Sequence, residues 1–143
     1  MSPGPLPCRG DQPCPCARVS ANGKALPFAA CCGQYLEGEA PTPTPDAASL
    51  MRSRYSAYVL QRESYLLATW HASTRPATLA FDTDGKWLGL QVRSAQVLDA
   101  EHAQVEFVAR FKPARAPAWR LHERSRFVLE NGRWYYLDGV QLP

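Results

Sequence analysis

Two close pairs of cysteines near the start of the chain are the residues best suited to chemistry. Fourteen residues separate the pairs, which occur as Cys14-Pro15-Cys16 and Cys31-Cys32-Gly33. Zinc prefers four soft ligands in a tetrahedron, with each sulfur at about 2.3 Å from the ion. The spacing therefore predicts one structural Zn²⁺ ion that is bound by Cys14, Cys16, Cys31 and Cys32.

Two other interpretations of the four cysteines are surface thiols and a redox pair. The Cys-x-x-Cys spacing typical of redox motifs is missing, which disfavours the second of these. A catalytic zinc is also disfavoured, because four cysteine ligands leave no open coordination position. The fifth thiol, Cys8, is predicted to be a bystander, although it could compete as a ligand.

Length and composition place the chain among small globular proteins. It has 143 residues, 45% of them hydrophobic, which suits one compact domain with a small appendage. The sequence contains neither an apolar run of the roughly 18 residues that span a bilayer nor a recognisable signal peptide. We therefore expect a cytoplasmic protein without membrane contact, in which the cysteines stay reduced.

Changes in composition divide the chain into four segments. Residues 1–12 lack periodicity and are predicted to form a flexible tail, whereas residues 13–37 hold the cysteine pairs. Residues 38–45 contain three prolines and are predicted to form an extended linker. Residues 46–143 remain for the main domain. Because residues 13–37 carry few apolar side chains, we expect metal binding to supply most of their folding free energy.

The main domain begins with a helical pattern. Asp46 can cap a helix whose apolar stripe contains Leu50, Met51, Tyr55, Tyr58 and Val59. Arg54 falls inside this stripe, whereas Arg52, Ser53 and Ser56 are expected to point elsewhere. A second helix is predicted over residues 63–70, and one or two further turns over residues 77–81.

From residue 86 the pattern changes to that of strands. We predict strands over residues 86–98, 105–111, 119–129 and 133–138. The last two are joined at Asn131-Gly132, a strong signal for a two-residue hairpin. Helices followed by an antiparallel meander predict an α+β domain with its helices packed on one face of the sheet.

The cysteine pattern resembles the SEC-C zinc motif, which is known from the C-terminal tail of the SecA translocation ATPase. Ala17 departs from that motif, which usually has glycine there, and the segment between the pairs is longer. The rest of the chain resembles the bacterial YchJ family (UPF0225) in blocks that follow the family's order: LMRSRYSAY and YLLATWH, then WLGL, FVARF, ERSRF and WYYLDG. The resemblance implies a SEC-C zinc knuckle joined to an NTF2-like cone, and it brings no activity.

Cones of the NTF2-like type commonly leave a cavity between helix and sheet, so polar residues on apolar faces are candidate pocket residues. They are Arg54, His71, Arg110, Glu123 and Ser125. In one interpretation Arg54 and Glu123 form a buried ion pair. In the other, Arg54 holds an anionic ligand, and His71 or Glu123 moves protons. The four tryptophans are predicted to be core residues, one of which could line a pocket: Trp70, Trp87, Trp119 and Trp134.

These observations favour an accessory protein over an enzyme. The knuckle is predicted to bind a protein or ribosomal partner, and the α+β domain to provide a dimer surface or a ligand pocket. A small-molecule enzyme or ligand binder that uses Arg54, Glu123 and His71 is the alternative. A basic row along one strand could meet phosphates, although a solvated sheet face is the commoner explanation: Arg120, His122, Arg124 and Arg126. The net charge of +3 neither demands nor excludes nucleic acid.

Overall fold

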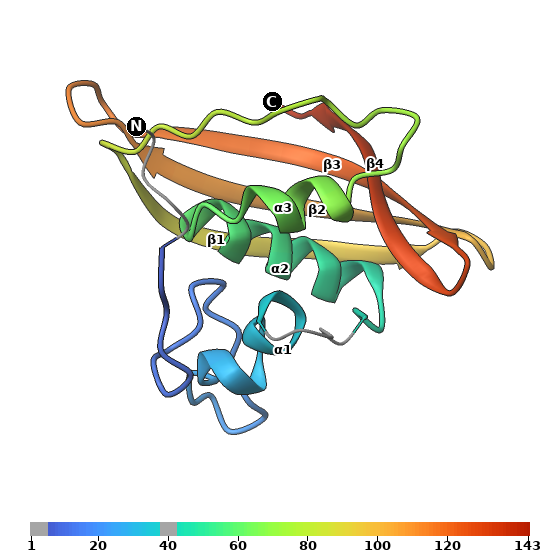
Figure 1. The fold of residues 1–143 in the computed structure, drawn as a ribbon, viewed down its shortest axis with the longest axis horizontal. Helices are drawn as coiled ribbons and strands as arrows, with labels where there is room; N and C mark the ends of the chain where they lie inside the picture. Colours follow the sequence, from blue (N-terminus) through green and yellow to red (C-terminus); the bar gives the residue numbers. More distant parts are fainter. Residues whose placement is uncertain (1–5, 38–42) are drawn as a thin grey trace.

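The computed structural model describes residues 6–37 and 43–143 (Figure 1). Most of the predicted linker, and residues 1–5 of the predicted tail, therefore lie outside the described residues. The helical elements are the 3₁₀ turn η1 (Phe28–Ala30), α1 (Gly33–Leu36), α2 (Ala47–Val59) and α3 (Glu63–Ala68). The strands are β1 (Lys86–Val97), β2 (His102–Lys112), β3 (Trp119–Glu130) and β4 (Arg133–Gln141).

The four strands form one antiparallel meander in the order β1-β2-β3-β4, which confirms the predicted α+β class. The hairpin between β3 and β4 turns at Asn131 and Gly132, whose φ angles are 53° and 76°. Two successive residues at positive φ are typical of the type I′ turn that matches strand twist. The Asn-Gly signal in the sequence therefore marked this turn correctly.

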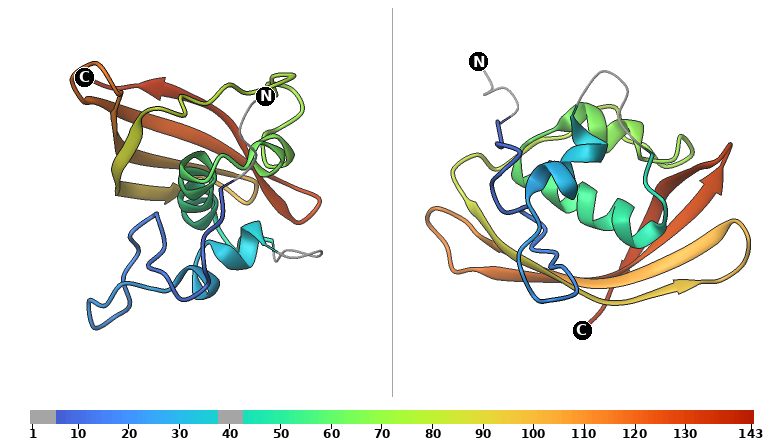
Figure 2. Two further views of the ribbon diagram at one scale, coloured as in Figure 1. Left: turned by 60° about the vertical axis from the view of Figure 1, so that its left-hand side comes forward. Right: turned by 90° about the horizontal axis from the view of Figure 1, so that it is seen from below.

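The sheet curves around α2, which lies on its concave face (Figure 2). The helix starts after Asp46 because the Oδ1 atom of Asp46 accepts a hydrogen bond from the backbone N–H of Ser49 at 2.7 Å. Leu50 of α2 packs in one buried cluster with alternate residues of β2, such as Val105 and Phe107. The period-2 pattern of β2 and the helical stripe thus meet in a common core.

The N-terminal knuckle lies on the side of α2 that faces away from the sheet (Figures 1 and 2). Its cysteines and Phe28 belong to the same buried cluster as the helix residues. Ser53 and Ser56 lie off the apolar stripe and are nevertheless fully buried, because the knuckle and α3 pack against them. The helix is covered on both sides, which a single apolar stripe does not reveal.

Residues 6–12 do not form the predicted flexible tail, because their backbone pairs with distant segments. The Leu6 N–H donates to the Leu60 carbonyl at 2.8 Å, and the Phe28 N–H donates to the Gln12 carbonyl at 2.7 Å. These hydrogen bonds fasten the segment both to the end of α2 and to the knuckle. Their partners lie up to 54 positions away (60 minus 6), beyond what local sequence pattern reports.

The predicted turns over residues 77–81 are absent from the described structure, where this segment is a loop. The Leu79 N–H donates to the Glu63 carboxylate at 3.0 Å instead of to a helical carbonyl. The second helix ends at Ala68, two residues before its predicted end. In the described part of the chain, no helix is both long and apolar enough to cross a membrane.

The prediction that all four tryptophans are core residues is wrong for Trp119, whose side chain is 46% exposed. Trp70, Trp87 and Trp134 are half-buried. Trp119 is the first residue of β3, where the strand extends past the end of α2 that would cover it. Its exposed ring lies beside Phe111, with the ring centres 5.2 Å apart.

Candidate metal centre and internal cavity

The four predicted metal ligands converge in the folded chain. The sulfur atoms of Cys14, Cys16, Cys31 and Cys32 all lie within 4.8 Å of one another, and all four residues are buried. The Cys16 and Cys31 sulfurs are 3.6 Å apart. A tetrahedral zinc with bonds of about 2.3 Å would hold its sulfurs about 3.8 Å apart. The cluster therefore has the ligand type, number and spacing to bind a metal ion, and Cys8 lies outside it.

Short backbone turns present the cysteines to one point. The Cys14 N–H donates to the Leu26 carbonyl at 3.0 Å, which joins the two arms of the knuckle. Cys31 closes η1 through its N–H to the Phe28 carbonyl, and Cys32 starts α1. Ala17, directly after the first pair, has a φ of 62°. That left-handed conformation explains why glycine would suit this position.

The thiols perturb one another strongly. Hydrogen bonds from Cys16 and Cys32 lower the pKa of Cys14 below its ordinary value. The pKa of Cys32 is raised above its ordinary value, because the neighbouring sulfurs and burial favour its protonated, neutral form. Four thiolates this close repel one another unless a cation lies between them. A bound divalent ion would remove that repulsion and bind all four as thiolates.

Three polar contacts fasten the knuckle to α2. Ser56 is within hydrogen-bond distance of the metal-site sulfur, since its Oγ lies 3.6 Å from the Sγ of Cys14. The Arg52 guanidinium donates to the Cys16 carbonyl at 3.2 Å, and the Arg18 guanidinium donates to Ser49 at 3.3 Å. The metal centre is thus connected directly to the helix that also lines the cavity on its other side.

The cavity lies between α2 and the concave face of the sheet, and it has a volume of about 260 Å³. Aromatic and aliphatic side chains form most of its wall. Three of the predicted pocket residues line it, namely Arg54, Glu123 and Ser125. Largely apolar walls with a few polar groups are typical of small-molecule sites.

Arg54 is a buried cation, with only 4% of its surface exposed. Its Nη1 donates to the Leu66 carbonyl and to the Thr69 hydroxyl, each at 2.8 Å. The guanidinium carbon lies 4.9 Å from the ring centre of Trp70 and 4.6 Å from that of Tyr136. Burial lowers the pKa of Arg54 below its ordinary value. Neutral acceptors and ring faces therefore compensate a charge that has been taken out of water.

The interpretation in which Arg54 and Glu123 form an ion pair is wrong, because no guanidinium nitrogen lies within 4.0 Å of a Glu123 carboxylate oxygen. Glu123 instead accepts a hydrogen bond from the Ser125 hydroxyl at 2.6 Å. Arg54 turns toward the end of α3, because one carbonyl and one hydroxyl oxygen accept its hydrogen bonds there. The cavity therefore offers one cationic and one anionic group that do not neutralise each other by contact.

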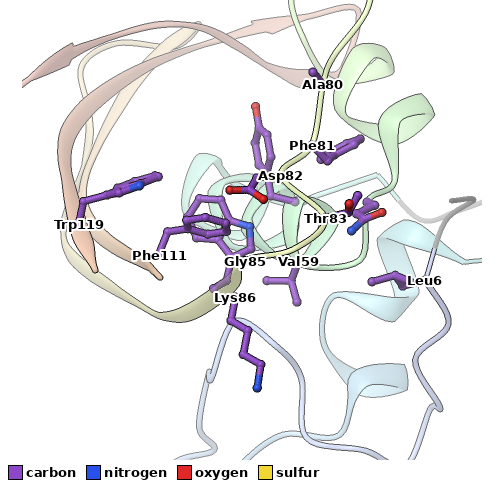
Figure 3. Close-up of a pocket in the computed structure, with 13 residues that line it drawn as sticks. Leu6, Val59, Ala80, Phe81, Asp82, Thr83, Gly85, Lys86, Phe111 and Trp119 are labelled. Carbon is purple, nitrogen blue, oxygen red and sulfur yellow. The ribbon is translucent and has the colours of Figure 1, made fainter. Parts of the chain in front are cut away.

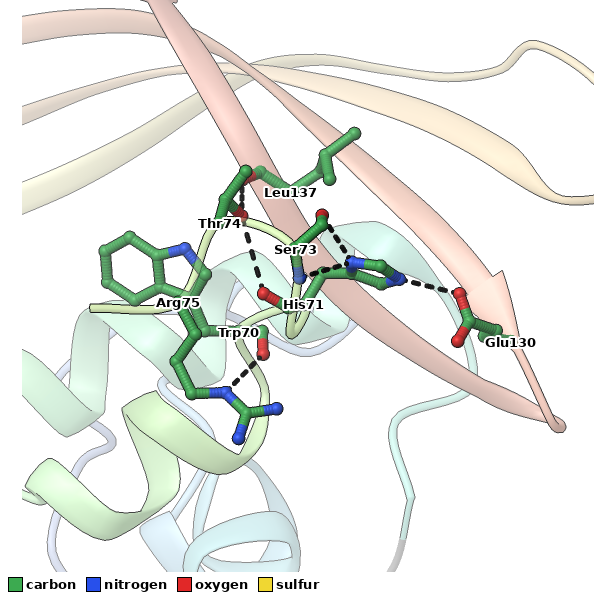
Figure 4. A network of polar contacts seen from close by, with 7 residues as sticks. All are labelled: Trp70, His71, Ser73, Thr74, Arg75, Glu130 and Leu137. Carbon is green, nitrogen blue, oxygen red and sulfur yellow. Dashed lines mark hydrogen bonds and ion pairs between the residues drawn. The ribbon is translucent and has the colours of Figure 1, made fainter. Parts of the chain in front are cut away.

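His71 does not line the cavity, which corrects its placement as a pocket residue. Its Nε2 pairs with the Glu130 carboxylate at 2.7 Å, and its Nδ1 lies 2.7 Å from the Ser73 hydroxyl (Figure 4). The backbone N–H of His71 donates to the Tyr136 carbonyl, and this hydrogen bond holds the segment after α3 against β4. The histidine therefore fastens a loop to a strand, as a residue next to a helix end often does.

Arg110 is also absent from the cavity wall. It lies opposite Arg120 in the β2–β3 register and is exposed. The side chains of a strand alternate between its faces, so Arg110 lies on the convex face while Ala109 and Phe111 face α2. Within the basic row of β3, His122 pairs with Glu106 and Arg126 pairs with Asp138. Contact with phosphates at this face stays a prediction.

Sequence reasoning missed Ser56 and the aromatic side chains that enclose Arg54. Ser56 lies three positions after Ser53, and a pair of small polar residues at this spacing is a weak signal of a second packed face. Tyr136 reaches Arg54 from β4, 82 positions away in the chain (136 minus 54). A contact over that distance leaves no periodic pattern in the sequence.

The family model for "YchJ, middle NTF2-like domain" matches residues 46–139. A UPF0225 protein of Polaromonas sp. (strain JS666) is 65% identical over 126 residues, which are 88% of this chain and 91% of that protein. A UPF0225 protein of Methylibium petroleiphilum is 55% identical over 132 residues, with 92% of this chain and 90% of that protein covered.

Two solved structures are similar to this one. A SEC-C motif containing protein from Psychrobacter arcticus is 32% identical with a TM-score of 0.76, over 90% of this chain and 82% of that chain. A SEC-C motif containing protein from Rhodopseudomonas palustris is 30% identical with a TM-score of 0.72, over 85% of this chain and 96% of that chain. The similarity thus extends through both the cysteine knuckle and the cone.

Proposed function

The chain belongs to the YchJ (UPF0225) family, and from that premise we propose that it binds a small organic molecule in a cone whose knuckle is held by one structural Zn²⁺ ion. The observation that supports this function is the buried Arg54 guanidinium at a mainly aromatic cavity without a carboxylate in contact. A site of this kind stabilises an anionic group that enters from solution.

The ligand class follows from the two charged groups of the cavity. Arg54 would bind a carboxylate or a similar anion, while Glu123 would accept a hydrogen bond from an amine or hydroxyl group. The aromatic walls suit a flat or apolar body between these groups. His71 lies outside the cavity, so Glu123 is the one member of the proposed proton-transfer pair that lines it.

The probe for this proposal is 4-aminobenzoate, which carries both groups and fits within about 260 Å³. In an NMR titration, we expect 4-aminobenzoate to shift the amide signals of cavity residues. It should bind more tightly than benzoate or aniline does. Arg54→Met should lower the affinity for 4-aminobenzoate at least about tenfold, because hydrogen bonds to charged groups contribute roughly 1.5–3 kcal/mol. Glu123→Gln should weaken the binding of 4-aminobenzoate and leave the affinity for benzoate unchanged.

Arg52→Met is the matched control, since Arg52 lies on the same helix and donates to Cys16 on the knuckle side. It should leave probe binding intact. Equal binding by wild type, Arg54→Met and Glu123→Gln would refute the proposal. Glu123→Gln keeps the shape of the side chain, so the test survives even if Arg54→Met fails to fold.

The metal part of the proposal is Zn²⁺, because four thiolates at tetrahedral spacing suit this ion and leave no open position for catalysis. Reduced, purified protein should contain one zinc per chain by elemental analysis. Cys31→Ser should lose the metal, whereas Cys8→Ser, a cysteine outside the cluster, should keep it. Metal-free wild type would contradict the assignment. A reducing compartment such as the cytoplasm would keep these thiols available.

The role of the knuckle in recruiting a protein or ribosomal partner, like dimerisation of the cone, stays a prediction.

A further inference from the structure

A second, open cleft lies beside the internal cavity and has a volume of about 450 Å³ (Figure 3). Its walls come from four parts of the chain: the N-terminal segment at Leu6, the end of α2, the loop before β1, and the adjoining ends of β2 and β3. It shares Tyr58 and Trp87 with the internal cavity, but neither Arg54 nor Glu123 lines it.

Five aromatic rings form a continuous cluster along this cleft. Consecutive ring centres lie between 5.0 and 6.2 Å apart in the order Phe81, Tyr58, Trp87, Phe111 and Trp119. Trp119 is 46% exposed, so part of the cluster is open to solvent. The faces of aromatic rings carry partial negative charge, which attracts cations that shed water easily.

Asp82 is the single carboxylate among the described residues that line the cleft, and it adds to this attraction. Asp82 is exposed, and its Oδ1 accepts a hydrogen bond from the Asp84 N–H at 3.2 Å. It makes no ion pair with any residue that the structure describes. The Asp82 carboxylate points into the cleft, while the amino group of Lys86 points away from the rings (Figure 3). The cleft therefore places one carboxylate beside apolar ring faces, while the amino group of Lys86, which also belongs to its lining, is directed away from the rings.

Gly85 holds the Asp82 loop against the aromatic cluster. A Cβ atom at this position would lie 2.3 Å from the Cζ atom of Phe111, far inside any real contact. Only glycine lets the loop approach the ring this closely. The carboxylate and the rings are thus placed together by the packing of the loop on β2.

We infer that this cleft binds an organic cation with a methylated or quaternary ammonium group. Such a group is large, weakly hydrated and positively charged, and it therefore matches aromatic faces together with one carboxylate. Ca²⁺ or Mg²⁺ would need six or more oxygen ligands, and the described residues of the cleft offer a single carboxylate. The inference stands independently of the proposed function, because it uses neither Arg54 nor Glu123.

Choline tests the inference when it is compared with its neutral isostere 3,3-dimethyl-1-butanol in an NMR titration of the full chain. We expect choline to shift the amides around Phe81, Phe111 and Trp119, and to bind at least about fivefold more tightly than the alcohol. Trp119→Ala and Asp82→Asn should each lower the affinity for choline at least about fivefold. Asp82→Asn should leave the affinity for the alcohol unchanged, because the variant loses only the charge of the side chain.

Asp84→Asn is the matched control, since it removes a neighbouring charge that does not line the cleft. Glu123→Gln, which keeps the shape of its side chain, separates this site from the internal cavity, and it should leave choline binding intact. Equal affinity for choline and the alcohol would overturn the inference, as would unchanged choline binding in both cleft variants. Both variants change exposed residues, so loss of folding would not obscure the result.

Discussion

Ala17 shows how one residue records a departure from a motif. It holds a φ of 62° directly after the first cysteine pair, a conformation that costs an L-residue about 1–2 kcal/mol. The SEC-C motif usually has glycine there, and the geometry explains why. The chain keeps the cysteine cluster despite this strain, because the hydrogen bonds of the knuckle, such as that from the Ala17 N–H to the Cys14 carbonyl, fix the turn.

Ala17→Gly should therefore stabilise the protein. Relief of the left-handed strain is partly offset by the greater freedom of glycine in the unfolded chain, about 0.5–1 kcal/mol. The expected net gain is about 0.5–1 kcal/mol in the free energy of unfolding, measured by urea denaturation of the zinc-loaded protein. Ala21→Gly, in the same loop at ordinary φ, should instead be neutral or destabilising. A loss of stability in Ala17→Gly would show that the turn is not strained.

At the scale of elements, α2 carries both candidate sites. One side of the helix brings Ser56 to Cys14, and the opposite side brings Arg54 to the cavity. The apolar stripe of α2 was predictable from its spacing, and so was the burial of Arg54 within it. The second packed side was not predictable, because its contacts are serines against a knuckle more than twenty residues upstream. Small hydroxyl residues have no periodic hydrophobic signature.

Ser56→Ala tests this connection between helix and knuckle. Groups that hydrogen-bond to metal ligands orient them, and their loss commonly costs about 10–100-fold in metal affinity. We expect zinc affinity, measured by competition with a chromogenic chelator, to fall within that range. Ser53→Ala is the control, because Ser53 is equally buried in α2 but bonds to Leu50 and Tyr65. Equal zinc affinity in both variants would remove Ser56 from the metal site.

At the scale of the whole molecule, the sheet, the paired helices and the knuckle are stacked in that order (Figure 1). The core is continuous through α2, since the cysteines and the β2 side chains belong to one buried cluster. The two ends of this stack differ in what holds them. The sheet has its backbone ladder and aromatic contacts, whereas the only buried apolar side chains in residues 13–37 besides the cysteines are Phe28 and Tyr35.

Removal of the metal should therefore unfold the two ends to different extents. After treatment with a strong zinc chelator under reducing conditions, we expect the amides of residues 13–37 to lose protection from hydrogen exchange. The amides of β2 and β3 should stay protected, because each of these strands pairs on both sides. The same chelator preloaded with zinc should change nothing. Uniform loss of protection across the sheet would show instead that the metal holds the whole fold.

The amino-acid sequence by itself determined the cysteine cluster, the main helix, the four-strand meander and the Asn131-Gly132 turn, because each depends on spacing between nearby residues. It did not determine which polar residues share a cavity. Arg54 and Glu123 line the same cavity without pairing, and His71 and Arg110 lie elsewhere. The tertiary structure decided these placements, since side-chain partners come from elements far apart in the chain. A buried charged side chain bonds to the acceptors that the packed elements place near it. These partners cannot be predicted from their separation in the sequence.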